Sequence, residues 1–206
     1  MELEPIRDIV KEMAILAYNM LEKTYKGFME HDRDILSEVL KDDDRLNELE
    51  KKVDIAVAGV SQREKISSAD KNTLIILANM AGDLEAIGDY CKDMIERIEI
   101  KIEEKLLFSE EAVAEYQHLY EAVKTALGQV ANALKMNDYK FIDGLLCAGN
   151  HVEELVDKYR QSHTQRLLQG VCTPMGCNMF LNLLDFTAAI YNHTKKTAVG
   201  LKKIGK

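Results

Sequence analysis

The sequence predicts an all-α protein of six antiparallel helices, arranged as two tandem three-helix bundles. Three observations lead to this prediction. The composition suits helices, with 2 Pro, 11 Gly and no Trp among 206 residues, and with 30% of the residues charged. Apolar residues recur three and four positions apart over long stretches, which is the period of one helical face. The two halves of the chain also resemble each other when they are aligned.

The longest apolar stripe predicts the third helix, from Leu74 to Ile102, or about eight turns. Its apolar positions are Leu77, Met80, Leu84, Ile87, Cys91, Met94, Ile98 and Ile102. A second stripe on the same helix consists of Glu85, Asp89 and Asp93, each four residues from the next. Like charges at that spacing repel each other, so a cationic side chain, open water or a bound metal must offset the repulsion.

Start signals place the other helices in order. We expect the first helix from Glu4 to about Glu30, and the second after an N-cap at Asp32, ending near Ser61. A serine-rich segment with Asp70 resembles a capping box at the start of the third helix. The predicted starts of the last three helices are Ser109, Asn137 or Asp138, and Thr173 followed by Pro174.

The chain reads as a duplication. A shift of 106 residues aligns the second predicted helix with the fifth, so that Leu36 matches Ile142 and Leu49 matches Leu155. A shift of 103 residues aligns the segment 83–94 with 186–197. Repeats of this length indicate duplicated supersecondary units. We therefore expect residues 1–105 and 106–206 to form one three-helix repeat each, the second one diverged.

Charge and motif content exclude several function classes. Residues 1–105 carry 16 Lys and Arg against 25 Asp and Glu, a net charge of −9, whereas residues 106–206 carry 11 against 10, a net of +1. An acidic half disfavours nucleic acid as a partner. No apolar run approaches the ~20 residues of a membrane helix. Acids occupy the N-terminus where a signal peptide has basic residues, so we expect a cytoplasmic protein without a leader. No nucleophile–base pair or phosphate-binding loop points to an enzyme.

Four residues form candidate metal ligands. Asp43 occupies a position that the apolar stripe of the second helix reserves for the core, and a buried carboxylate needs a partner. Asn47 lies one turn further along the same face. Glu85 and Asp89 repeat this spacing on the third helix. If these antiparallel helices are neighbours, the two pairs gather oxygen ligands suited to hard cations. The alternative is a solvated acidic face with Lys92 and Lys51 as partners.

The run from Asp83 to Tyr90, DLEAIGDY, resembles the D-L-E-R-I-G-D-H motif of the PhoU family of phosphate-homeostasis regulators. The resemblance implies paired three-helix bundles, with Glu85, Asp89 and Asp43 as metal ligands. Asn47 departs from it, because an amide stands where the family usually has a carboxylate. The implied cofactor is iron, zinc or manganese. The implied partner is a phosphate transporter at the membrane or its sensor kinase. The sequence does not decide whether the protein forms a homodimer.

Three alternatives remain beside this reading. PhoU-like repeats also occur as the cytoplasmic domain of sodium–phosphate cotransporters, and the opening residues are compatible with a domain of that kind. A ferritin-like carboxylate bundle would use Glu-x-x-His pairs, but Glu115 and His118 form the only pair with that spacing. The last alternative is a helical scaffold without a ligand. The sequence distinguishes it from the PhoU-like reading only because Asp43 lies in an apolar stripe.

The second repeat does not predict a matching metal site. Ala188 and Asn192 align with Glu85 and Asp89, and Gly149 and Glu153 align with Asp43 and Asn47. Alanine and glycine offer no side-chain ligand. A lone histidine such as His193 is more often hydrogen-bonded than metal-bound. We therefore expect any metal to bind mainly in the first repeat.

The four cysteines do not predict a disulfide framework. Cys91 and Cys147 lie in apolar runs, where a thiol behaves as a small hydrophobe. Cys172 and Cys177 have the spacing of half a metal site. Because the sequence shows no second pair of Cys or His nearby, their spacing alone does not predict a zinc site.

Overall fold

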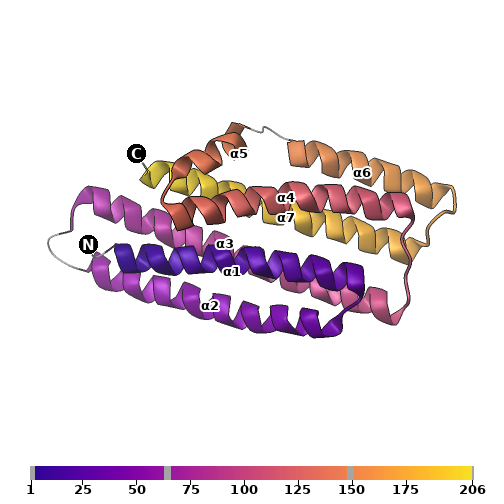
Figure 1. The fold of residues 1–206 in the computed structure, drawn as a ribbon, viewed down its shortest axis with the longest axis horizontal. Coiled ribbons are helices and arrows are strands. Elements are labelled where there is room, and N and C mark those ends of the chain that lie inside the picture. The colour runs from indigo at the N-terminus through magenta and orange to yellow at the C-terminus, as the bar shows by residue number, and fades with distance from the viewer. Residues whose placement is uncertain (1–2, 63–65, 148–150, 206) are drawn as a thin grey trace.

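The structure is a computed structural model that describes residues 3–62, 66–147 and 151–205. Over these ranges the protein is helical, without strands, and the all-α prediction is confirmed. The helices are α1 (Glu4–Glu30), α2 (Arg33–Ser61), α3 (Ser68–Glu103), α4 (Glu110–Met136), the short 3₁₀ helix η1 (Tyr139–Ile142), α5 (Asp143–Cys147), α6 (His151–Leu168) and α7 (Pro174–Ile204). Most run lengthwise through an elongated molecule (Figure 1).

The predicted N-caps are confirmed by their hydrogen bonds. The side chain of Asp32 accepts from two backbone N–H groups of the first turn of α2. Ser67 accepts from the N–H of Asp70, Ser109 caps α4, and the hydroxyl of Thr173 accepts from the N–H of Gly176 in α7. Each bond satisfies a donor that the helix itself leaves unpaired. These polar side chains therefore explain where four of the long helices begin.

The fifth predicted helix does not begin as a regular α-helix. Asn137 has a left-handed φ of 51° and ends α4, while Asp138 caps η1. The predicted fifth segment is divided into η1, α5 and α6, and residues 148–150, including Gly149, lie outside the described residues. The six-helix prediction is therefore roughly consistent with the described residues, and the difference is the 3₁₀ turn η1 at the start of the fifth segment.

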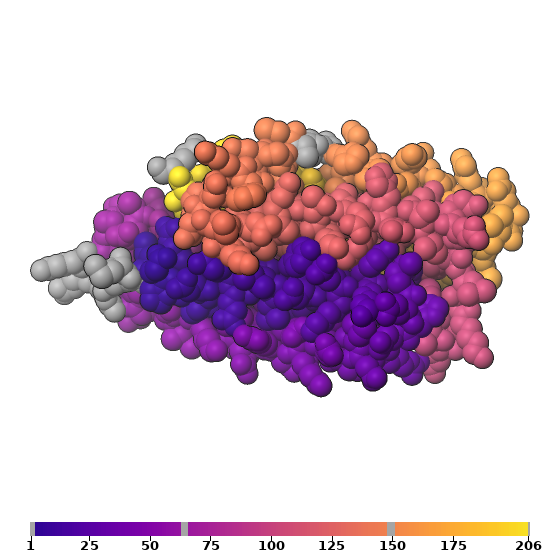
Figure 2. Space-filling view, viewed as in Figure 1, coloured from indigo at the N-terminus to yellow at the C-terminus, as the bar shows by residue number. Residues whose placement is uncertain are grey.

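The central pair of helices is α3 and α7, which share the most extensive helix–helix contact. Gly200 of α7 lets the backbones approach, since a Cβ there would lie 2.9 Å from Cγ of Met80. α1 packs against α2, α3 and α4. Between α1 and α4, the rings of Tyr25 and Tyr120 stack with centroids 3.7 Å apart. The halves of the chain therefore lie against each other along most of the molecule, which appears as one elongated body in Figure 2.

A single apolar core runs through both halves. The predicted stripe of α3 is buried from Leu77 to Ile98. Two pairs of positions matched by the predicted repeat are buried in both halves, namely Leu36 with Ile142 and Leu49 with Leu155. Cys91 is buried as expected, but Cys147 is exposed, because it ends the short helix α5 rather than lying within a long one. The prediction that Cys147 is a core residue is therefore wrong.

Candidate functional site

The candidate site lies where α2 and α3 pack side by side. α2 supplies Asp43 and Asn47, four residues apart, and α3 supplies Glu85 and Asp89 with the same spacing. Residues four apart on a helix share one face. The charges of Asp89 and Asp43 both act on the carboxyl of Glu85. The structure therefore places the predicted acids of the two helices in one electrostatic neighbourhood.

Asp43 is buried, with 2% of its surface exposed. Its Oδ2 accepts a hydrogen bond from Nζ of Lys92 at 3.2 Å. Its Oδ1 is buried and has no hydrogen-bond partner, and the same holds for Oδ1 of Asn47. A buried oxygen without a donor costs free energy, on the order of 1–3 kcal/mol. Carboxylate and amide oxygens such as these two are the ligand type that hard cations prefer.

Gly88 allows α3 to approach Asp43. A Cβ at this position would lie 2.5 Å from Cδ2 of Leu46 and 3.3 Å from Oδ1 of Asp43. A Cβ essentially never lies 2.5 Å from another atom, so a larger residue here would force Leu46 to shift within the packed core. The glycine of the DLEAIGDY motif thus brings α3 close to the buried carboxylate of α2.

The acids of the site are poorly compensated. Burial, followed by the charges of Asp89 and Glu50, raises the pKa of Glu85 to about 7. Burial also raises the pKa of Glu50, with Asp54 and Asp89 contributing. A raised carboxyl pKa means that the folded protein disfavours the charged form of that carboxyl group. A bound cation would reverse this, because it favours the carboxylate over the acid.

Glu50 is a member of the site that sequence reasoning missed. It lies seven residues after Asp43 and three after Asn47, so all three occupy one face of α2. A Cβ at Gly82 of α3 would lie 3.6 Å from Oε1 of Glu50, which places this carboxylate against α3. The spacing of Glu50 from Asp43 was the available signal. The candidate site therefore contains one more acid than predicted.

The site is not a closed set of ligands. Among the described residues, the predicted acids do not form a group of three His, Cys, Asp or Glu whose ligand atoms all lie within 4.8 Å of one another. Asp89 is exposed and Glu85 half-buried, so both can turn, whereas Asp43 is fixed by its burial. The alternative of a solvated face accounts for Lys92, which pairs with Asp43, but it leaves the two buried oxygens without partners.

The aligned positions of the second half serve other contacts. Nδ1 of His193 lies 2.8 Å from Oδ1 of Asp83, as expected for a hydrogen-bonded histidine. This contact joins α7 to α3. Lys195 pairs with Glu153 at 3.3 Å. Asn192 lines a groove between α3 and α7 instead of joining a cluster of acids.

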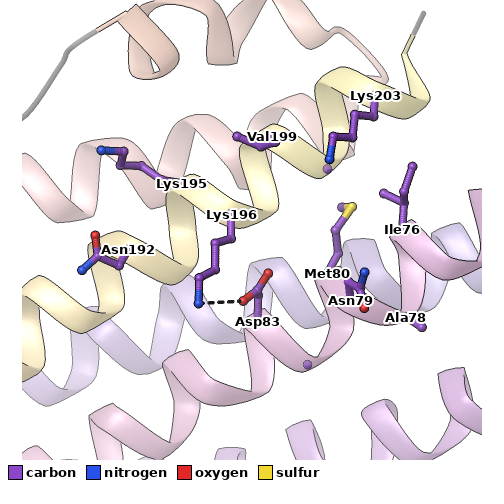
Figure 3. A pocket seen from close by; sticks show the side chains of 12 residues that line it. Ile76, Ala78, Asn79, Met80, Asp83, Asn192, Lys195, Lys196, Val199 and Lys203 are labelled. Atoms are coloured by element: carbon purple, nitrogen blue, oxygen red, sulfur yellow. Dashed lines mark ion pairs between the residues drawn. The ribbon is translucent and has the colours of Figure 1, made fainter.

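The α3–α7 groove has a volume of about 880 Å³ and was not predicted from sequence. Three lysines of α7 border it: Lys195, Lys196 and Lys203. Figure 3 shows Lys196 reaching toward Asp83, whose Oδ1 lies 3.9 Å from Nζ. Met80 and Val199 give the groove an apolar part. Lysines predominate among the charged residues that line this groove, whereas acids predominate between α2 and α3.

The ferritin-like alternative loses its only candidate pair. Glu115 binds Arg166 through both carboxylate oxygens, and Nδ1 of His118 lies 2.6 Å from the hydroxyl of Tyr159. Both side chains are committed to partners on α6. Neither is aimed at a shared ligand site.

Comparison with known proteins identifies a domain in the first half of the chain. The sequence profile of the PhoU domain matches residues 10–98, which include all four predicted ligands and the DLEAIGDY motif. Residues 10–98 are a PhoU domain. The second half of the chain lies beyond the matched range. No curated protein matches the chain at a significant level.

Solved structures extend the likeness in fold to the whole chain. PhoU from Pseudomonas aeruginosa superposes with a TM-score of 0.91 at 18% identity, covering 98% of this chain and 96% of that one. The phosphate transport system regulatory protein PhoU from Streptococcus pneumoniae gives 0.84 at 11% identity, covering 98% and 94%. A putative PhoU-like regulatory protein from Shewanella oneidensis gives 0.66 at 13% identity, covering 98% and 95%. The PhoU fold therefore continues past the matched domain.

In the described part of the chain, none of the helices is long and apolar enough to cross a membrane.

Proposed function

We propose that this protein regulates phosphate uptake by binding a membrane phosphate transporter or the transporter's sensor kinase. The observation that carries the proposal is the PhoU domain at residues 10–98, set within a PhoU fold that spans the chain. The similar protein from Streptococcus pneumoniae is a regulatory protein of a phosphate transport system. The protein would act at the cytoplasmic face of the membrane and without catalytic turnover of its own.

The acidic site between α2 and α3 is the proposed cofactor site, for iron, zinc or manganese. Asp43 and Asn47 would offer the buried oxygens that now lack donors. Glu85 and Asp89 would complete the set from α3, with Glu50 as a further carboxylate nearby. When bound, the cation supplies positive charge that offsets the repulsion between these acids. Oxygen donors of this kind suit manganese and iron, and zinc also accepts carboxylates.

The protein–protein part of the proposal is tested with defined partners. The purified chain is mixed with the detergent-solubilised phosphate ABC transporter, with its sensor kinase, and with a sodium–phosphate cotransporter from the same organism. Co-elution with the first or second supports the proposal. Association with the cotransporter alone would favour the alternative, a cytoplasmic domain that regulates such a carrier. Absence of all three complexes would contradict both.

The non-enzymatic part is tested on the same preparation. We expect no phosphatase and no nucleotide hydrolase activity. Turnover that Glu85→Gln abolishes, with the helical circular dichroism unchanged, would make the protein an enzyme and overturn this part.

A further inference from the structure

A second cluster of potential metal ligands lies at the opposite half of the chain, where α6 is followed by α7. His163 comes from the C-terminal part of α6, Cys172 from the connection and Cys177 from the first turn of α7. One ring nitrogen and the two sulfur atoms all lie within 4.8 Å of one another. Within residues 3–62, 66–147 and 151–205, this is the group of three that meets that limit.

The local sequence fixes the three side chains. Gly170 has a φ of +71°, a conformation that favours glycine, and the chain turns back there after α6. Thr173 caps α7 and Pro174 is its first residue, so Cys177 lies in the first turn of a capped helix. The ring of His163 stacks on Phe180 with centroids 4.2 Å apart. Three separate stretches of chain are thus held at one point.

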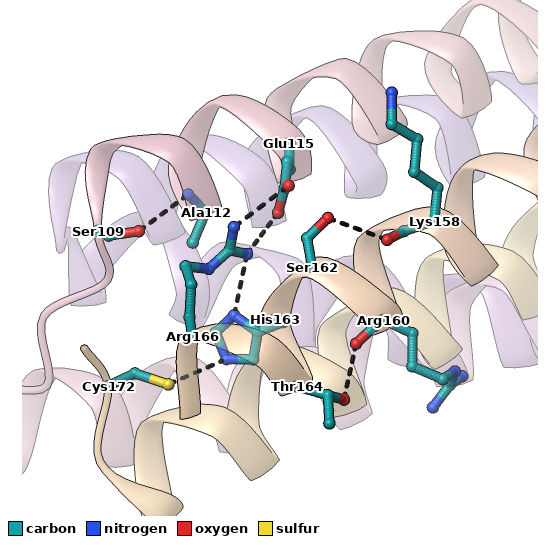
Figure 4. Close-up of polar contacts among 10 residues, drawn as sticks. All are labelled: Ser109, Ala112, Glu115, Lys158, Arg160, Ser162, His163, Thr164, Arg166 and Cys172. Atoms are coloured by element: carbon teal, nitrogen blue, oxygen red, sulfur yellow. Dashed lines mark hydrogen bonds and ion pairs between the residues drawn. The ribbon is translucent and has the colours of Figure 1, made fainter. Parts of the chain in front are cut away.

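The imidazole of His163 is buried and uncharged, and it faces a cysteine. His163 has 1% of its surface exposed, and burial together with the Arg166 charge lowers its pKa to about 4, so the ring is neutral at neutral pH. Figure 4 shows Nε2 of the ring facing Cys172, whose Sγ lies 3.9 Å away. Cys177 is buried beside them, while Cys172 is partly exposed. A soft ligand set is therefore reachable from solvent at one edge.

Arg166 does not make the cluster hostile to a cation. Its guanidinium is neutralised by Glu115, with Nη1 and Oε1 3.2 Å apart. Arg166 Nη2 lies 3.1 Å from Nδ1 of His163. A guanidinium carries donors only, so Nδ1 accepts in this contact and the proton of the neutral ring lies on Nε2. For Nε2 to bind a metal, this proton must move to Nδ1, and the contact with Arg166 Nη2 must break.

We propose that His163, Cys172 and Cys177 bind zinc or a similar thiophilic divalent cation, which ties α6 to α7. Two thiolates and one imidazole are three of the four ligands of tetrahedral zinc, and a water reached past Cys172 is the fourth. The two thiolate charges cancel those of the ion, so binding adds no net charge to the site. Ligand atoms around one zinc lie roughly 3.3–3.8 Å apart. The present separations therefore require movements of about 1 Å.

This site is independent of the acidic site between α2 and α3 and of the proposed regulatory function. Sequence reasoning found only the two cysteines. The histidine lies nine residues before Cys172, on α6, whereas Cys177 lies on α7. If the regulatory proposal failed, the ligand cluster would be unaffected, since it lies outside the matched range 10–98.

Cobalt binding tests the proposal, because cobalt reports its ligands through its absorption. The full-length chain is reduced, freed of metal with a chelator and titrated with Co²⁺ without oxygen. We expect one equivalent to produce thiolate-to-cobalt charge-transfer absorption and the visible bands of tetrahedral cobalt. Carboxylate oxygens do not give the charge-transfer absorption, so this absorption reports cobalt at the cysteines and not at the acidic site.

Variants assign the signal to residues. Cys172→Ser and Cys177→Ser should each remove about half or more of the charge-transfer absorption, and His163→Gln should weaken Co²⁺ binding at least about tenfold. Cys147→Ser, at an exposed cysteine of α5, is the matched control and should change nothing. As a second readout, Zn²⁺ should raise the melting temperature of the wild type but not of Cys172→Ser, whose partly exposed position favours normal folding.

The contradicting results are equally specific. Absence of charge-transfer absorption in the reduced wild type would overturn the proposal. So would absorption that survives in both cysteine variants. A Cys172–Cys177 disulfide without any metal binding by the reduced protein would identify a redox pair instead, and it would also overturn the proposal.

Discussion

Asp43 of α2 and Lys92 of α3 form an ion pair that uses only one of the two carboxylate oxygens. Lys92 Nζ lies 3.2 Å from Oδ2, while Oδ1 is buried without a partner. Lys92 is about half exposed, with 49% of its side-chain surface accessible. An exposed lysine contributes little, about 0–1 kcal/mol, to such a pair. The buried carboxylate is therefore incompletely compensated, and the proposed cation site depends on this feature.

The first prediction concerns the metal response of this site. Manganese, iron or zinc should raise the melting temperature of the wild type, because metal that binds the folded state stabilises it by mass action. The double change Asp43→Asn with Asp89→Asn should abolish the response to manganese. It should also raise the melting temperature of the metal-free protein, since it removes repulsion. Differential scanning fluorimetry checks both effects.

Two controls accompany this measurement. Asp44→Asn, at an exposed acid next to Asp43, should leave the manganese response intact. Ala substitution at His193 should lower the melting temperature, because it breaks the contact with Asp83, yet should keep the manganese response. If manganese, iron and zinc all fail to shift the wild type and elemental analysis finds none of them, the α2–α3 acids are a solvated face.

The second prediction concerns pH. The pKa of Glu85 is raised from 4.5 to about 7 in the folded protein. Between these values the folded state binds more protons than the unfolded state, so the stabilising contribution is present below pH 4.5 and is lost as the pH rises through 7. The free energy of unfolding of the metal-free wild type should therefore fall relative to that of Glu85→Gln over this window.

The comparison with Glu85→Gln is essential, because the titration of His163 makes the free energy of unfolding rise with pH, which is opposite to the effect of Glu85. Its pKa is lowered to about 4, so its contribution is lost as the pH falls. The difference between wild type and variant, measured by urea unfolding at several pH values, isolates Glu85. Glu48→Gln, at an exposed acid of α2, should run parallel to the wild type. A flat difference for Glu85→Gln would show that Glu85 titrates normally.

The third prediction concerns the close approach of α3 to α2. Gly88→Ala should destabilise the protein, because the new methyl would lie 2.5 Å from Leu46 Cδ2 in a packed core. Overpacking costs about 1–3 kcal/mol, and the better helix propensity of alanine offsets up to about 1 kcal/mol of this. Gly59→Ala is the matched control, since nothing lies within 4 Å of a Cβ there.

Gly59→Ala should stabilise the protein by up to about 1 kcal/mol. Chemical denaturation of the two variants gives opposite signs on this account. Equal stabilisation by both would mean that α2 and α3 can separate at Gly88 without cost, and the tight packing beside Asp43 would be disproved.

Much of the fold followed from local sequence, because capping and period are local properties. Asp32, Ser67, Ser109 and Thr173 each start a helix as predicted. The 3₁₀ start of the fifth segment did not follow, since its apolar spacing resembles that of α2. The buried position of Asp43 was also predictable, because an acid interrupted a regular apolar stripe.

Parts of the sites that depend on contacts between distant residues could not be predicted. The neighbourhood of His163 with Cys172 and Cys177 depends on how α6 packs against α7. The pairing of His193 with Asp83 joins residues 110 positions apart. Glu50 shares a face with Asp43, but only the three-dimensional approach of α3 shows that its charge matters to Glu85.

Phosphate uptake in cells tests the central claim most directly. The rate of uptake of labelled phosphate is measured in phosphate-replete and in phosphate-starved cells, and the ratio of the two rates is compared between the wild type and a strain lacking this protein. We predict that the loss of the protein changes this ratio several-fold and that the intact gene restores it. An unchanged ratio in the strain that lacks the protein would contradict its assignment as a regulator of phosphate uptake.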